Sequence, residues 1–92
     1  MAYQLIFTVQ ADQDLNKIKV WYDTINVKLT QDLFSELSDE FKLMKKSPLI
    51  YQARYKLIRI AFLKRFEYGI HFIVENKQLI VLRILHNKQF FG

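Results

Sequence analysis

The sequence contains no cysteine, two glycines and one proline among its 92 residues. The lack of cysteine excludes a disulfide-stapled scaffold, a thiolate metal site and a cysteine nucleophile, and it favours the reducing cytoplasm. Hydrophobic side chains make up 51% of the chain and aromatic ones 15%, which excludes a disordered protein. We therefore expect one small globular domain over residues 1–92.

Long hydrophobic runs are also missing. No stretch of about 18 uncharged apolar residues exists, and residues 1–8 lack the basic start and the apolar length of a signal peptide. We expect a soluble protein that is not exported and does not contact a membrane. The chain further lacks a paired-carboxylate site in its predicted strands, a glycine-rich phosphate loop and metal-ligand spacing, so we expect no metal, no small-molecule cofactor and none of the enzyme classes that need them.

Charge is distributed unevenly along the chain. Residues 1–44 carry four lysines and seven acidic residues, a net charge of −3, whereas residues 45–92 carry ten basic and two acidic residues, a net charge of +8. A basic second half predicts a polyanion or an acidic protein as partner, and a merely solvated basic surface is the alternative.

The first half of the sequence has the pattern of one strand and two helices. Residues 3–8 are β-branched and aromatic, as in a short strand. Thr8 can cap a helix over residues 9–23, and Asn26 can cap a second helix that ends at Ser47-Pro48. The apolar positions of the second helix recur every three to four residues, at Leu29, Leu33, Leu37, Phe41 and Met44. These elements predict a helical hairpin, with Trp21 packed between it and the rest of the protein.

From Tyr55 onward the apolar period changes to two, which predicts three strands over residues 55–62, 68–75 and 79–86. Asn76-Lys77 suits a tight hairpin turn, because Asn tolerates positive φ. The predicted order is β-α-α-β-β-β. This is an α+β domain in which the helical hairpin packs on one face of a mainly antiparallel sheet, with residues 3–8 beside one of the later strands.

The alternation within these strands assigns residues to the two faces of the sheet. The set expected under the helices is Ile58, Ile60, Phe62, Ile70, Phe72, Val74, Ile80, Leu82 and Ile84. Arg59, His71 and Arg83 would then share the opposite face, bordered by Lys56, Lys64, Arg65 and Lys88.

Such a cationic surface could cleave RNA through its 2′-hydroxyl, with Arg59 and Arg83 neutralising the phosphate and His71 or His86 moving the proton. The alternative for His71 is a solvated residue of the sheet, and the alternative for His86 is a residue that only closes the end of its strand. Phe90 and Phe91 would either fill a groove of the protein itself or dock a partner.

Three segments of the predicted sheet carry a further pattern, residues 54–60 (RYKLIRI), 66–72 (FEYGIHF) and 80–88 (IVLRILHNK). Together they resemble the C-terminal half of the RelE/ParE toxins of type II toxin–antitoxin systems. They are similar to that family's arginine strand, its Phe-Pro-Tyr-type turn and its last strand, which ends near His before basic residues. Ala11, Asp14-Leu15 and Pro48 fit its first half, whereas Glu67 stands where the family usually has proline.

The resemblance implies a cognate acidic, partly disordered antitoxin as partner, and one of two toxic activities. ParE-type members inhibit DNA gyrase, while RelE-type members cleave messenger RNA on the ribosome. The Phe-x-Tyr turn and the His-Asn-Lys-Gln end of the last strand favour the ParE side. On that side we expect Lys64, Arg65, Lys88, Phe90 and Phe91 to bind the partner. On the RelE side, Arg59, Arg83 and His86 would be catalytic.

Overall fold

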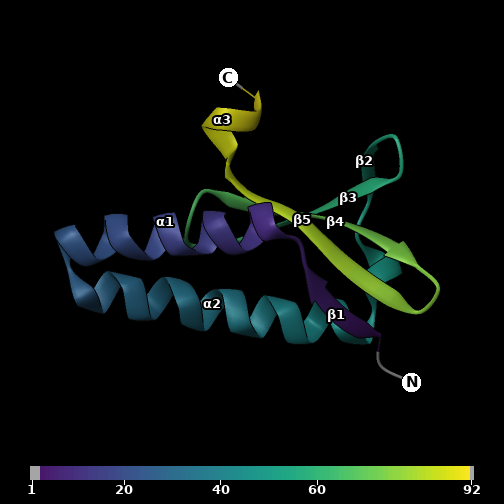
Figure 1. Ribbon diagram of the computed structural model, residues 1–92, viewed down its shortest axis with the longest axis horizontal. Coiled ribbons are helices and arrows are strands. Elements are labelled where there is room, and N and C mark those ends of the chain that lie inside the picture. Colours follow the sequence, from purple (N-terminus) through teal and green to yellow (C-terminus); the bar gives the residue numbers. More distant parts are fainter. Residues whose placement is uncertain (1–2, 92) are drawn as a thin grey trace.

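The structure, a computed structural model, describes residues 3–91, and their side chains up to residue 89. The elements in chain order are β1 (Gln4–Phe7), α1 (Val9–Ile25), α2 (Val27–Lys46), the 3-10 turn η1 (Pro48–Ile50), β2 (Ala53–Tyr55), β3 (Ile58–Phe62), β4 (Tyr68–Glu75), β5 (Gln78–His86) and α3 (Asn87–Phe91). Helices α1 and α2 run side by side as an antiparallel hairpin, and α3 stands at the opposite end of β5 from β1 (Figure 1).

The limits of the helical hairpin follow from its capping residues. The Oγ1 atom of Thr8 accepts a hydrogen bond from Ala11 N at 3.1 Å, and Oδ1 of Asn26 accepts one from Lys28 N at 2.8 Å. Both satisfy backbone donors that a helix leaves free at its start. Helix α2 ends at Lys46, just before Ser47-Pro48, so the predicted caps and the predicted stop are confirmed.

The five strands form one sheet in the order β1-β5-β4-β3-β2. Strand β1 is parallel to β5, and the other neighbours are antiparallel. The predicted α+β class is therefore confirmed, with the first strand beside the last. The Asn76-Lys77 turn is confirmed as well, because both residues have positive φ, 51° and 65°.

Three short elements were not expected from the sequence. The strand predicted over residues 55–62 is two strands, β2 and β3, because Lys56 turns the chain with a φ of 50°. The alternation of side chains that predicts a strand cannot reveal a turn inside a run of residues that are all suited to strands. Turn η1 follows Pro48, and α3 begins directly after β5.

The predicted core face of β5 is wrong over half of its length. Leu79 and Val81 are fully buried, whereas Ile80 and Leu82 are only partly buried. The cause is a bulge, since His71 pairs with Arg83 but Phe72 pairs with Val81, which leaves Leu82 as the extra residue. The bulge shifts the alternation by one position, so that Ile84 is buried as predicted.

Candidate functional site

Arg59 does not lie with the other predicted cationic residues. It pairs with Phe72 across the β3–β4 ladder, so the two side chains share the face that packs on the helices. Its Nη1 atom donates to the carbonyl oxygen of Tyr51 at 2.6 Å. The predicted grouping of Arg59, His71 and Arg83 on one face is therefore wrong, because the register of β3 against β4 places Ile60, and not Arg59, opposite His71.

Arg83 forms a bidentate ion pair with Asp14 of α1. Its Nε and Nη2 atoms donate to the carboxylate at 2.8 and 3.0 Å, and the backbone N of Ile84 donates to the same carboxylate at 2.9 Å. The hydrogen bond with Asp14 raises the pKa of Arg83. The side chain of Arg83 is still 47% exposed, so it can contact a ligand while Asp14 holds it.

The Asp14 contact exists because the outer edge of β5 changes partner along its length. Strand β1 pairs with β5 only as far as Val81. Beyond that point the hydroxyl of Thr8 donates to Leu82 O at 2.8 Å, and Asp14 takes the N–H of Ile84. Helix α1 thus satisfies backbone groups that a missing strand would otherwise leave unpaired.

His71 is buried, with 1% of its surface exposed, and is not a solvated residue. Its Nδ1 atom is 2.9 Å from the hydroxyl of Tyr55. Burial, and then the positive charge of Arg83, lower the pKa of His71, while burial raises the pKa of Tyr55. A neutral imidazole in this place contributes to packing and hydrogen bonding and is closed to a substrate.

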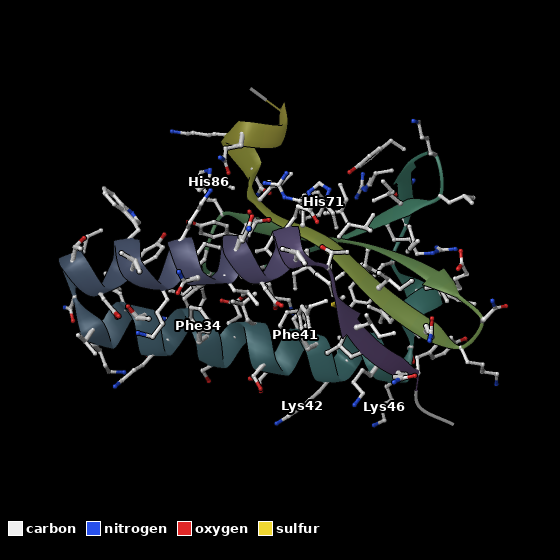
Figure 2. All side chains as sticks on the ribbon, in the orientation of Figure 1. Phe34, Phe41, Lys42, Lys46, His71 and His86 are labelled. Carbon is white, nitrogen blue, oxygen red and sulfur yellow. The ribbon has the colours of Figure 1, made fainter. Side chains whose placement is uncertain are left out.

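His86 lies at the junction of β5 and α3, away from His71 (Figure 2). Its ring packs edge-on against Tyr68, with centroids 5.2 Å apart, and its Nε2 atom is 3.8 Å from Oε2 of Glu67. Because Lys88 N donates to Nδ1 at 3.1 Å, the proton of the neutral ring is on Nε2. His86 is the one predicted proton carrier with a partly exposed ring.

The predicted partner-binding residues lie in two places. Lys64 and Arg65 are exposed, and their backbone N–H groups both donate to Glu36 of α2, at 2.6 and 3.2 Å. Lys88 is exposed on α3. The side chains of Phe90 and Phe91 lie outside the described part of the chain, although both residues belong to α3.

An apolar groove was not anticipated from the sequence. It has a volume of about 390 Å³ and is lined by Leu5, Phe7, Leu15, Phe34, Leu37, Ser38, Phe41, Lys42 and Lys45. Phe41 packs edge-on against Phe7, with centroids 5.2 Å apart, and Lys42 stands on the same helix (Figure 2). Three aromatic rings with a lysine border suit an apolar segment that carries negative charge.

The described residues include neither a membrane-spanning helix nor a cluster of metal ligands. Within residues 3–91, no helix is long and apolar enough to cross a bilayer. No group of three or more His, Cys, Asp or Glu side chains in the same range could hold a metal ion.

The fold is similar to that of chains in solved structures of toxin–antitoxin systems. A chain of the chromosomal ParDE system from P. aeruginosa superposes with a TM-score of 0.79 at 21% identity, over 92% of this chain and 96% of that one. A chain of the RelBE2 complex from Mycobacterium tuberculosis gives 0.62 at 17% identity, over 94% and 99%. A chain of the E. coli DinJ-YafQ complex gives 0.61 at 18% identity, over the whole of both chains.

The family match is more specific than these likenesses of fold. No curated protein matches the chain. Residues 5–91 match the family described as ParE toxin of type II toxin–antitoxin system, parDE. That range takes in the helical hairpin, the whole sheet and α3, so the chain belongs to the ParE toxin family.

Proposed function

We propose that this ParE-family protein arrests bacterial growth by binding DNA gyrase and that it does not cleave RNA. The observation that carries the proposal is that the three candidate catalytic residues have separate partners, with Arg59 and Arg83 on opposite faces of the sheet. Arg59 is turned toward Tyr51, Arg83 is paired with Asp14, and His86 packs against Tyr68 at the end of β5. In-line cleavage needs cations and a proton carrier around one phosphate, and this arrangement does not provide them.

A supercoiling assay tests the proposal directly. Purified gyrase is incubated with relaxed plasmid and ATP, with and without an excess of the protein, and messenger RNA from expressing cells is examined in parallel. We expect supercoiling to be inhibited, DNA breaks to accumulate and messages to stay intact. Normal supercoiling at excess protein, together with messages cut inside ribosomes, would reverse the proposal.

His86 is the specific reason to keep RNA cleavage as the second candidate. Its fixed tautomer, partly exposed ring and neighbouring Glu67 are features of a group that can move a proton. On the gyrase reading, His86→Gln leaves most of the toxicity, whereas Lys64→Ala in the basic turn lowers it. If His86→Gln abolishes toxicity in a folded protein while Lys64→Ala keeps it, the nuclease reading takes the place of ours.

We also propose a cognate antitoxin whose acidic, amphipathic segment occupies the apolar groove between β1 and the helical hairpin. The rings of Phe34 and Phe41 would hold its apolar side chains, and Lys42 and Lys45 its carboxylates. These lysines belong to the basic end of α2, which also carries Lys46.

Neutralising two lysines of the groove tests this placement. Lys42→Gln with Lys45→Gln should weaken antitoxin binding several-fold and reduce its dependence on salt, because exposed charges act mainly through long-range attraction. Lys28→Gln is the matched control, since Lys28 is on the same helix but pairs with Asp32 outside the groove. Equal losses in the control and in the double variant would contradict the placement.

A further inference from the structure

A second, polar pocket lies between α1, β5 and α3, apart from the apolar groove. Its volume is about 220 Å³, and it is lined by Asp14, Lys17, Ile18, Trp21, Tyr68, Arg83, Ile84 and Gln89. It shares no residue with the groove and contains neither Lys64 nor His86. Neither the gyrase nor the antitoxin proposal uses it.

The acidic group of this pocket is already satisfied. Oδ2 of Asp14 accepts from Arg83 Nε and Ile84 N, and Oδ1 accepts from Arg83 Nη2. Its charge is therefore balanced within the protein, and it gives an incoming anion little repulsion. What Asp14 does provide is a fixed orientation for the guanidinium of Arg83.

The remaining polar groups of the pocket are donors. Within the described residues, Lys17 is exposed and has no ion pair, and Nη1 of Arg83 makes no hydrogen bond. Gln89 uses its Oε1 atom to accept from His86 N at 3.1 Å, which leaves the amide N–H groups of its side chain available. Two cations and an amide donor around a small space are the chemistry that binds an oxyanion.

Trp21 forms an aromatic wall of the same pocket. The expectation that it packs between hairpin and sheet is wrong, since 60% of its surface is exposed. It follows Lys17 by four positions in α1, so the two side chains lie on one face of the helix, one turn apart. An exposed indole beside a cationic pocket offers a stacking surface for a flat, anionic ligand.

We propose that this pocket binds a nucleoside monophosphate, with the phosphate between Lys17 and Arg83 and the base stacked on Trp21. A volume of about 220 Å³ lies below the usual size of a site that encloses a whole ligand. The pocket therefore receives the phosphate, while the base stays outside on the indole. The phosphate suits the site better than a carboxylate, because it offers three acceptor oxygens to the donors of Lys17, Arg83 and Gln89, whereas a carboxylate offers two. No bond is broken, so this binding does not depend on the toxic activity.

Fluorescence of Trp21 gives a site-specific test, because it is the one tryptophan of the chain. The full-length protein is excited at its indole and titrated with thymidine 5′-monophosphate, thymidine, inorganic phosphate and N-acetylaspartate. We expect saturable quenching by the monophosphate, competition by inorganic phosphate, and much weaker binding of thymidine. Lys17→Gln should weaken binding of the monophosphate about tenfold, the loss of one charge-assisted hydrogen bond at a half-exposed site.

Lys19→Gln is the matched control. Lys19 lies on the same helix near Trp21 but pairs with Asp23 at 2.7 Å, outside the pocket, so its loss should leave binding within twofold of the parent protein. The proposal is overturned if thymidine quenches as strongly as the monophosphate, if N-acetylaspartate binds as tightly, or if Lys19→Gln weakens binding as much as Lys17→Gln. Absence of saturable quenching by the monophosphate also overturns it.

Discussion

Replacing Asp14 with alanine should lower the free energy of unfolding by about 3 kcal/mol, the sum of two losses. The first is the buried N–H of Ile84, which loses its acceptor and costs roughly 1–3 kcal/mol when left unpaired. The second is the Arg83 ion pair, which contributes at most about 1 kcal/mol because the side chain of Arg83 is 47% exposed to water and salt.

Two further variants separate these losses. Asp14→Asn keeps an oxygen for Ile84 N but loses the charge, so it should cost only about 1 kcal/mol. Lys19→Ala breaks an exposed pair spaced i,i+4 on the same helix and should cost about 0.3–0.5 kcal/mol.

Urea denaturation followed by far-ultraviolet circular dichroism measures all three variants. In thermal melts, the Asp14→Ala loss corresponds to a decrease of roughly 10–25 °C for a domain of this size. An Asp14→Ala loss no larger than that of Lys19→Ala would refute the reasoning. It would mean that water replaces the carboxylate at the edge of β5.

Three other perturbations follow from single residues. Burial lowers the pKa of His71 below its usual 6.5, so below that pH the unfolded chain binds a proton that the folded chain does not. The free energy of unfolding should therefore fall as the pH drops below about 6.5, by at most ~1.4 kcal/mol per pH unit. His71→Gln should flatten this slope in pH-dependent urea melts, and an unchanged slope would contradict the assignment. Gly69→Ala should destabilise by about 1–3 kcal/mol, because the added Cβ would lie 2.9 Å from Cγ2 of Ile60, and a neutral result in the same melts would show that β3 can shift. Lys77→Gly should stabilise the fold by roughly 0.5–1 kcal/mol, since it relieves a lysine at a φ of 65°, and a lower melting temperature would show that the turn has no strain to relieve.

The local elements and the fold class could be predicted from the sequence alone. Thr8 and Asn26 have side-chain oxygens that can accept the first helical N–H groups, and Pro48 disfavours a helical conformation at Ser47, so the helix limits are properties of short segments. The apolar period changes from about 3.6 to two after Pro48, and this change, which is also a property of short segments, separates the helices from the strands. The loose motifs of residues 54–60, 66–72 and 80–88 were sufficient to indicate the family, which the match over residues 5–91 shows.

Which side chains meet depends on the three-dimensional packing of the strands and helices. A single extra residue at Leu82 reverses the face of Leu79 and Val81, and a left-handed Lys56 divides one predicted strand in two. Neither changes the local pattern of apolar residues, so alternation could not predict that Arg59 leaves the face of His71. The partner of Arg83 is 69 positions away in the sequence, on α1. The length of β1 determines this partner. Beyond the end of β1, the edge of β5 has no neighbouring strand, and the side chain of Asp14 accepts the hydrogen bond that a backbone carbonyl would otherwise accept.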